Sequence, residues 1–149
     1  MEVMSTPMVS RLRFVAVGQA DPLAEPLLIE LADEYATRYG STAERISAWL
    51  RGYPADEFAA PDGGMLIGLL DGTPVTGGAF RRFGVVDGAH TAELKRIWTE
   101  SGHRRLGFAR ALLDNLESRI AAAGYRRLAE PLPAEGEVYP IAFEKSLGE

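Results

Sequence analysis

Hydrophobic and polar residues alternate with a changing period along the chain, and the first third indicates one strand followed by two helices. Leu12–Val17 has the composition of a short strand. The apolar residues after it recur at the spacing of one helix face; they are Leu27, Leu28, Leu31, Ala32 and Tyr35. Gly40 is expected to end that helix, and Ser41 or Thr42 can cap the next one.

The middle of the chain predicts three strands joined by tight turns. The apolar segments are Met65–Leu70, Thr73–Phe83 and Thr91–Thr99. An Asp-Gly pair, which is a strong hairpin signal, stands between each segment and the next. We therefore expect an antiparallel meander, with a bulge at the paired glycines Gly77 and Gly78.

The last third predicts a helix between two strands. The helix is expected over residues 107–123, with an apolar stripe formed by Leu112, Leu113, Leu116 and Ile120. Gly124 ends it, and Tyr125–Leu128 begins a strand, so this part predicts a right-handed parallel crossover. Val138–Leu147 is expected to return as a final extended segment.

Composition places the chain among ordinary soluble globular proteins. Its 149 residues fit one domain spanning residues 1–149, and 46% of them are hydrophobic and 25% charged. No apolar run approaches the length that crosses a bilayer, and Met1–Ser10 lacks the pattern of a secretory signal. The expected location is therefore the cytoplasm, without a membrane partner.

The residue types present exclude several kinds of chemistry. The chain has no cysteine, which removes disulfides, thiolate catalysis and Cys-based zinc sites. Its two histidines, His90 and His103, offer little for a multi-histidine metal site or a Ser–His–Asp triad. The net charge of -5 argues against nucleic-acid binding. The segment from Glu93 to Arg110, however, contains five cationic and two acidic side chains. This local excess of positive charge favours a small polyanionic ligand.

The most informative segment is Glu93–Leu113, where a predicted strand passes through a polar turn into a helix. The first turn of a helix carries unpaired N–H groups and a partial positive charge. Small residues at Gly107 and Ala109 allow a ligand to approach the backbone closely. Three arginines nearby, Arg104, Arg105 and Arg110, add positive charge. These features predict an anion site of the kind that binds a pyrophosphate.

The sequence HRRLGFARALL resembles the coenzyme A motif of the GNAT superfamily of acetyltransferases, Arg/Gln-x-x-Gly-x-Gly/Ala. Arg104, Gly107 and Ala109 stand at its fixed positions. The predicted order of elements is similar as well. The resemblance implies the GNAT acyl-CoA N-acyltransferase fold, an α/β arrangement with a mixed, mostly antiparallel central sheet flanked by helices. It also implies acetyl-CoA as co-substrate, with no metal.

The resemblance assigns roles to residues by position. It places the coenzyme A pyrophosphate over the backbone of Arg104, Arg105, Leu106, Gly107, Phe108, Ala109 and Arg110. The pantetheine arm would pair with the backbone of Ile97, Trp98 and Thr99. Glu93, eleven residues before Arg104, stands at the spacing of the family's general-base glutamate. A charged residue on the polar face of a strand is the alternative interpretation of Glu93.

The tail departs from the family pattern. The family has a fourth helix after its fifth strand, with a tyrosine that can protonate the leaving thiolate. Here 25 residues follow Gly124, with prolines and no amphipathic helical pattern. We expect that helix to be missing and the C-terminal part to be abbreviated. Tyr139 is the remaining candidate for the general acid.

Three functions are compatible with this pattern. The first is an N-acetyltransferase that moves an acetyl group from acetyl-CoA to a primary amine of a small molecule, amino acid or peptide. The second is a catalytically weak or inactive acyl-CoA-binding relic of the same fold. A nucleotide- or phosphate-binding regulator could use the same anion site. An apolar flank left bare by the missing helix would favour a homodimer.

The acceptor side, by the same resemblance, is formed by the first two helices and their loop, roughly Tyr35–Phe58. Its aromatic residues are Tyr35, Tyr39, Trp49, Tyr53 and Phe58. Three carboxylates lie near them in sequence, namely Glu34, Asp56 and Glu57. This composition predicts an acidic, aromatic pocket that suits a cation, although aromatic residues at helical spacing are commonly part of a core.

Overall fold

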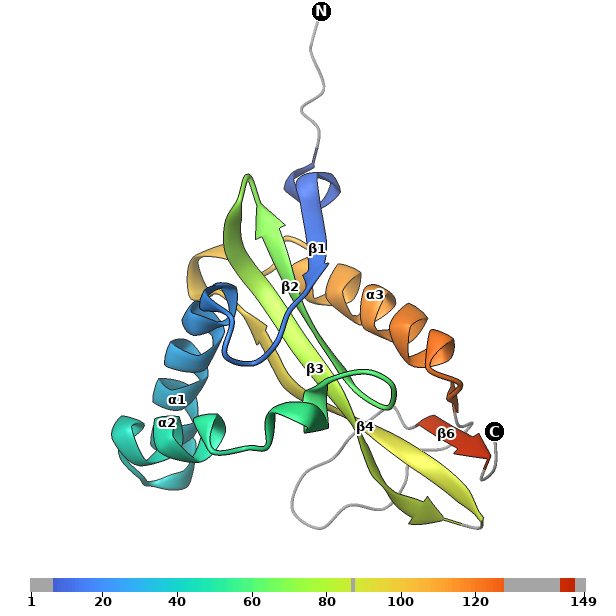
Figure 1. The fold of residues 1–149 in the computed structure, drawn as a ribbon. Coiled ribbons are helices and arrows are strands. Elements are labelled where there is room, and N and C mark those ends of the chain that lie inside the picture. Colours follow the sequence, from blue (N-terminus) through green and yellow to red (C-terminus); the bar gives the residue numbers. More distant parts are fainter. Residues whose placement is uncertain (1–6, 87, 128–142, 147–149) are drawn as a thin grey trace, which may run out of the picture.

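The computed structural model describes residues 7–86, 88–127 and 143–146, which form a twisted sheet with helices on both faces (Figure 1). The strands are β1 (Leu12–Ala16), β2 (Gly64–Leu70), β3 (Thr73–Val86), β4 (Ala89–Thr99), β5 (Arg126–Arg127) and β6 (Phe143–Ser146). The helices are α1 (Glu25–Tyr39), α2 (Ala43–Arg51) and α3 (Phe108–Ala122). Short 3-10 turns are η1 (Met8–Arg11), η2 (Pro22–Ala24), η3 (Ala55–Phe58) and η4 (Ser101–His103). The strand order is β1-β2-β3-β4-β6-β5.

The first four strands form the predicted antiparallel meander. The turn between β2 and β3 uses positive φ angles at Asp71 (50°) and Gly72 (84°), which suit the twist of a tight hairpin. The predicted bulge is confirmed, since the register between β3 and β4 shifts between Gly77 and Ala79. The extra residue lies on β4, where Arg96 adopts a φ of 58°.

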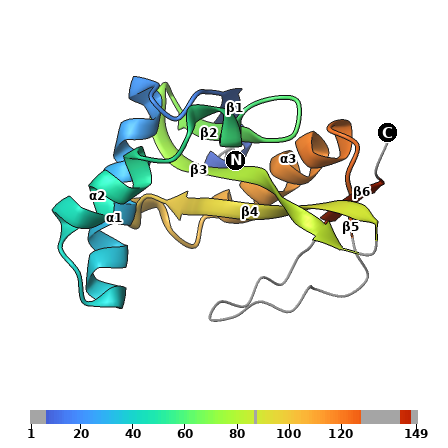
Figure 2. The same cartoon turned by 60° about the horizontal axis from the view of Figure 1, so that its bottom comes forward.

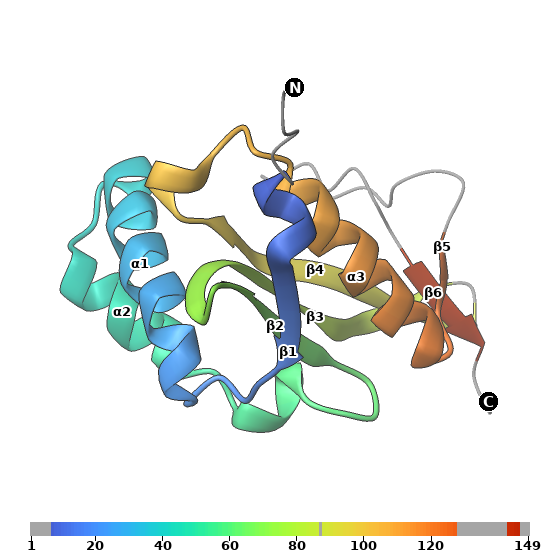
Figure 3. The ribbon, with the colours of Figure 1, turned by 90° about the horizontal axis from the view of Figure 1, so that it is seen from above.

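Helices α1 and α2 cover one face of the sheet, and α3 covers the other (Figures 1 and 3). The first helix ends at Gly40, whose φ of 66° gives the left-handed cap that the sequence predicts. Thr42 caps α2 by accepting a hydrogen bond from the Arg45 backbone N–H at 3.2 Å. These caps fix the connection between the two helices, and η3 follows α2 on the same face.

Hydrophobic cores fill the space between the sheet and the helices on both of its faces. Leu27, Leu28 and Leu31 of α1 are at most 1% exposed and belong to a core that also includes strand residues such as Ile67. On the other face, Leu112, Leu116 and Ile120 of the predicted α3 stripe are at 0% exposure, whereas Leu113 is half-buried. This stripe packs against Leu66 and Phe80, among others. The sheet is therefore packed between helices on both of its faces, and this packing holds β4 in a fixed position.

The two C-terminal strands, β5 and β6, lie in an order that the sequence did not predict. Strand β5 runs parallel to β4 after α3, as a crossover requires, but β6 lies between them and pairs antiparallel with both. The final segment returns to the sheet at Phe143–Ser146, while the rest of Val138–Leu147 lies outside the described residues. Residues 128–142, where we expect the family's fourth helix to be missing, lie outside the described residues, so the abbreviated C-terminal part stays a prediction.

One edge of β4 is only partly paired. Strand β6 pairs with Ala89–Ala92. Over residues 93–99 the same edge has no strand partner within the described ranges. Figure 2 shows β3 and β4 extending past α1 and α2 to their hairpin turn. Among the described residues, no helix is both long and apolar enough to span a membrane.

Candidate functional site

The loop from β4 to α3 forms the first part of the candidate site. Figure 3 shows it passing from the end of β4, beside α1, to the start of α3. Gly107 is the N-cap of α3, with a φ of 84°, and Arg105 also has a positive φ of 64°. The first N–H groups of a helix this long lack intrahelical partners and lie at the positive end of its dipole. An added Cβ at Gly107 would meet one atom within 4 Å, from Val9 at 3.9 Å, so the backbone here is open to a ligand.

A cavity of about 360 Å³ lies at this helix start. Nine of the ten residues predicted to bind coenzyme A line it, from the end of β4, the loop and the first turn of α3. The tenth, Leu106, does not line it and is 37% exposed. Glu34 and His103 complete the lining. The structure therefore brings together, in one cavity, residues that the sequence analysis grouped by motif and by strand position.

Two carboxylates hold the loop in place. Glu30 of α1 accepts hydrogen bonds from the Trp98 indole N–H at 3.3 Å and from the Ser101 backbone N–H at 2.9 Å. Glu100 binds the His103 ring and accepts from the Gly102 backbone N–H at 3.0 Å. The hydrogen bond from His103, followed by the bond from Gly102, lowers the pKa of Glu100. No motif in the sequence pointed to Glu30, because its partners are about seventy residues away.

The main chain of β4 alternates in direction where it borders the cavity. The Trp98 carbonyl accepts a hydrogen bond from the Thr76 hydroxyl at 2.8 Å, and the Glu100 N–H donates to the Val75 carbonyl at 2.7 Å. Both groups therefore face β3. Because successive backbone groups of a strand point to opposite sides, Thr99 and the carbonyl of Ile97 face the unpaired edge.

Trp98 contributes to the site differently from its neighbours. Its side chain is 2% exposed and belongs to the core beneath α1. Its indole N–H is held by Glu30, and its carbonyl by Thr76. The pairing of pantetheine with the backbone of Ile97, Trp98 and Thr99 stays a prediction. Of the three residues, Trp98 is the one whose carbonyl is already bound to Thr76.

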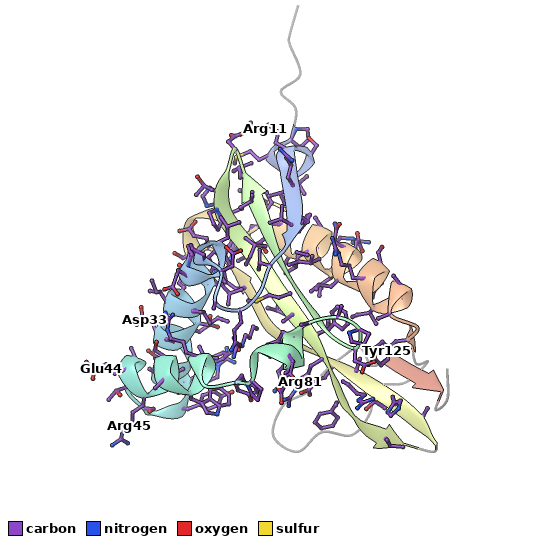
Figure 4. All side chains as sticks on the ribbon, viewed as in Figure 1. Arg11, Asp33, Glu44, Arg45, Arg81 and Tyr125 are labelled. Atoms are coloured by element: carbon purple, nitrogen blue, oxygen red, sulfur yellow. The ribbon has the colours of Figure 1, made fainter. Side chains whose placement is uncertain are left out.

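The predicted general base, Glu93, lies on the α1/α2 face in a cluster of ion pairs. Its carboxylate accepts a hydrogen bond from Arg81 Nε at 2.8 Å and lies 3.7 Å from Lys95 Nζ. Arg81, which is labelled in Figure 4, also binds Glu57 of η3 at 2.6 Å. Although burial opposes it, hydrogen bonds to Glu93 and Glu57 raise the pKa of Arg81. Arg81 and Glu93 are direct cross-strand partners, so hairpin register was the signal that could have revealed this pair.

Arg96 lies on the same face, contrary to its grouping with the anion site by sequence. It is 5% exposed, and its guanidinium lies 5.1 Å from the Tyr53 ring centre and 4.7 Å from that of Phe58. It donates to the Gln19 side-chain oxygen at 3.1 Å and to the Leu50 carbonyl. Within the described ranges it has no carboxylate ion pair. Burial lowers the pKa of Arg96.

The predicted acceptor-side residues divide between core, cluster and surface. Phe58 is 2% exposed and belongs to the core, whereas Tyr39 and Trp49 are about half exposed at 54% and 53%. Tyr53 packs between Trp49 and Phe58, with ring centres 5.4 and 5.8 Å away. Glu34 lines the cavity at the start of α3 and pairs with Arg38. Two of the three carboxylates, Glu34 and Glu57, therefore have arginine partners, and Asp56 is exposed.

Two further expectations concern the general acid and metals. Tyr139 lies outside the described residues. Tyr125, which precedes β5, is 4% exposed and donates a hydrogen bond to the Asp62 carbonyl at 3.1 Å, so it is part of the packing between β5 and the loop before β2. The described residues contain no group of histidines and carboxylates arranged to hold a metal ion.

Comparison with known proteins identifies the family. A family model described as the acetyltransferase (GNAT) family matches residues 28–134. The match covers more than two thirds of the chain, and the chain belongs to this family. It is thus an acyltransferase by class, and the resemblance seen in the motif is confirmed. No curated protein gives a significant match to the sequence.

Solved structures of similar fold include three bacterial acetyltransferases. An acetyltransferase of the GNAT family from Staphylococcus aureus Mu50 has 13% identity and a TM-score of 0.51, over 91% of this chain and 99% of that one. A structure from Exiguobacterium sp. 255-15, assigned as an acetyltransferase, has 16% identity and a TM-score of 0.58, over 91% and 93%. A predicted acetyltransferase from Clostridium acetobutylicum, solved with acetyl-CoA, has 12% identity and a TM-score of 0.52, over 74% of each chain. At these identities the likeness establishes the fold.

Proposed function

We propose that this protein is an N-acetyltransferase that transfers an acetyl group from acetyl-CoA to a primary amine of a small molecule, amino acid or peptide. One observation carries the proposal. The anion cavity at the start of α3 is continuous with the unpaired edge of β4, because Ile97 and Thr99 line that cavity. A ligand with a pyrophosphate and an extended amide-bearing arm matches both parts at once.

The chain's own groups suggest how such a ligand would be held. The N–H groups from Gly107 to Arg110 and the side chain of Arg104 would bind the pyrophosphate, as helix N-termini do elsewhere. The amides of the pantetheine arm would pair with the main chain of Ile97 and Thr99, in the manner of a strand added to a sheet edge. Following β4 further leads to Glu93, so the thioester would approach the cluster of ion pairs.

Acetyl transfer requires a deprotonated amine held beside the thioester. The amine nitrogen bonds to the acetyl carbon, the carbon–sulfur bond breaks, and the amine proton must leave. Glu93 is the candidate to accept that proton, directly or through water. Arg81, bound to it at 2.8 Å, would fix its orientation. Tyr139 stays the candidate that protonates the departing thiolate. Holding the two reactants together supplies much of the acceleration without a metal or a covalent intermediate.

The relic hypothesis remains the alternative, and the sequence of the tail favours it. The 25 residues after Gly124 contain prolines and no amphipathic helical pattern, whereas the family helix at that place flanks the thioester. Such a chain would bind coenzyme A and transfer acetyl groups slowly. The enzyme and relic hypotheses therefore both predict coenzyme A binding, and a measurement of the acetyl-transfer rate distinguishes them.

The test is amine-dependent release of coenzyme A thiol from acetyl-CoA. The chain has no cysteine, so a thiol reagent detects the product without a background from the protein. The proposal predicts thiol release that saturates with both substrates. Tight binding of coenzyme A without amine-dependent release would support the relic. Absence of coenzyme A binding, or equal competition by ATP, would contradict both and favour a nucleotide-binding role.

A further inference from the structure

His103 lies on the wall of the cavity at the start of α3, and the proposed function gives it no role so far. It is the last residue of η4, in the loop between β4 and α3. Its side chain is 32% exposed, so it is neither a core residue nor a fully solvated one. An imidazole in this place can serve the loop as a support or serve the ligand as a contact.

One ring nitrogen of His103 is already bound within the loop. Its Nδ1 contacts the Glu100 carboxylate, three residues earlier in the chain. The hydrogen bond from His103, followed by the bond from the Gly102 N–H, lowers the pKa of Glu100, so this carboxylate is ionised. An ionised carboxylate only accepts hydrogen bonds, and Nδ1 therefore carries a proton. Nε2 is left for a ligand, since no group in the described ranges is hydrogen-bonded to it.

The ring is also held against the first residue of α3. The imidazole of His103 stacks on the ring of Phe108, with centres 6.0 Å apart and 19° between the two planes. Phe108 is 1% exposed, so it is a fixed support. Stacking sets the plane of the imidazole, and the bond to Glu100 sets its rotation within that plane. Because Phe108 begins α3, the imidazole lies beside the helix start at which the pyrophosphate is proposed to bind.

The charges that border the cavity favour an anion there. Its lining includes one carboxylate, Glu34 of α1, which is paired with Arg38 at 3.0 Å. Three arginines also line the cavity and form no ion pair within the part of the chain that the structure describes, namely Arg104, Arg105 and Arg110. These arginines are exposed, whereas the ring of His103 is fixed in position by its two contacts.

We infer that His103 binds the pyrophosphate of coenzyme A through its Nε2–H group, while Glu100 on the other ring nitrogen orients the imidazole. This inference rests on the proposed function. Both ring nitrogens donate in the complex, so the bound imidazole is in its charged form. Its hydrogen bond to a phosphate oxygen then joins two opposite charges, which makes it stronger than a neutral hydrogen bond.

Two substitutions of His103 separate ligand contact from loop support. In His103→Asn the side-chain amide nitrogen takes the place of Nδ1, and in His103→Gln it takes the place of Nε2. The asparagine variant keeps the bond to Glu100 and should weaken coenzyme A binding by about ten- to hundredfold, the effect of a hydrogen bond to a charged group. The glutamine variant should lose less affinity. If asparagine binds coenzyme A as tightly as glutamine, or more tightly, the inference is overturned.

Thermal unfolding of the same two variants reports on the loop itself. The asparagine variant should be the more stable of the two, because it keeps the contact with Glu100. The expected order of affinity is therefore the reverse of the expected order of stability. A loss of affinity that simply followed the loss of stability would mean that His103 only supports the loop.

His90→Gln provides both a control and a background for a direct measurement. His90 lies on β4 and does not line the cavity, so its replacement should leave coenzyme A affinity unchanged. In that background His103 is the remaining histidine of the sequence, so its ring gives the imidazole signals of a nitrogen NMR spectrum. With coenzyme A bound at neutral pH, both ring nitrogens should show the shifts of protonated nitrogen. An unprotonated Nε2 in the complex would contradict donation to the phosphate.

Dephospho-coenzyme A identifies the phosphate that His103 contacts. It keeps the pyrophosphate and lacks the phosphate on the ribose. The loss of affinity in His103→Asn should therefore be as large with dephospho-coenzyme A as with coenzyme A. A loss seen with coenzyme A alone would assign the contact to the ribose phosphate and overturn the inference.

Inorganic pyrophosphate distinguishes failure of the inference from failure of the proposed function. It requires the anion site and no other part of the coenzyme A site. A protein that binds pyrophosphate most tightly as wild type, less tightly as His103→Gln and least as His103→Asn, yet releases no thiol from acetyl-CoA, would support the inference and refute the enzyme. An active acetyltransferase with equal coenzyme A affinity in wild type and both variants would support the proposed function and refute the role of His103.

Discussion

Arg96 and Arg104 show how local backbone geometry decides what a residue can do. They stand in one short basic segment of the sequence, and both were expected near the anion site. The bulge in β4 gives Arg96 a φ of 58° and directs it into the α1/α2 layer. Arg104 follows the strand and lines the cavity at α3. Counting charges along the sequence could not separate them, because one extra residue in a strand moves a side chain to the other face.

Gly107 provides the sharpest test at the scale of a residue. Gly107→Val should weaken coenzyme A binding by more than about tenfold, because the left-handed φ of 84° and the approach to the backbone both disfavour a branched side chain. Calorimetry measures the affinity. Gly88→Val is the matched control, since Gly88 has a φ of 78° in the β3–β4 turn, away from the cavity. Equal losses in both variants would indicate backbone strain alone.

Arg104 should contribute through its charge. Arg104→Ala is expected to weaken coenzyme A binding by about 1.5–3 kcal/mol, as for a hydrogen bond to a charged group. Its guanidinium lies at the cavity, with Nε 3.5 Å from the Thr99 carbonyl. The loss should shrink at high ionic strength, because the site is open to solvent. An affinity that is unaffected at low salt would remove Arg104 from the site.

Glu93 tests the proposed proton transfer. Glu93→Gln should lower kcat at neutral pH by roughly 10²–10⁴, the usual contribution of general acid–base catalysis. The deficit should narrow as pH rises, because the amine then loses its proton without help. Glutamine can still accept a hydrogen bond from Arg81, so coenzyme A affinity should stay constant. Wild-type turnover at every pH would leave Glu93 as a structural partner of Arg81.

At the scale of elements, the sequence predicted most of the fold and less of the site. The meander, three helices and the helix caps followed from periodicity and turn residues, since these are local properties. The interposition of β6 between β4 and β5 did not, because strand order depends on contacts between distant segments. The motif residues line one cavity at the start of α3 for the same local reason, since they are close in the sequence. The contacts of Glu30 and Arg96 join α1 and α2 to β4, so only the folded chain shows them.

The contact between α1 and the β4–α3 loop leads to a prediction of its own. Glu30→Ala should leave the Trp98 indole N–H without its acceptor and destabilise the fold by about 1–3 kcal/mol. In a Trp49→Phe background, Trp98 is the remaining tryptophan, so its fluorescence reports this bond directly. Glu30→Gln keeps an acceptor oxygen and should retain most of the stability and coenzyme A affinity. If the alanine variant matched wild type in denaturation and fluorescence, Glu30 would not hold the loop.

At the scale of the whole molecule, the outer half of the β3–β4 hairpin presents apolar side chains to solvent. Phe83 is 61% exposed and Val85 56%. Exposed apolar sheet surface favours association, so we predict a concentration-dependent dimer measurable by light scattering. Phe83→Ser should shift it toward monomer. Ile29→Ser, at a site on α1 that is also 56% exposed, is the control and should not. A wild-type monomer at high concentration would contradict the prediction.

The features of the candidate site gather around β4. One end of the strand leads into the cavity at α3, its edge over residues 93–99 has no strand partner among the described residues, and its α1/α2 face carries the ion-pair cluster. The helices on both faces of the sheet hold β4 in place, so these three features keep fixed positions relative to one another. A single extended ligand lying along this strand is therefore the simplest occupant.

A crystal structure of the protein with coenzyme A tests this account most directly. The account predicts the pyrophosphate within hydrogen-bonding distance of the backbone N–H groups from Gly107 to Arg110. It also predicts the pantetheine amides paired with Ile97 and Thr99, and the thiol directed toward the Glu93 cluster. Coenzyme A bound elsewhere, or a segment of the chain itself paired along the edge of β4 at Ile97–Thr99, would contradict it.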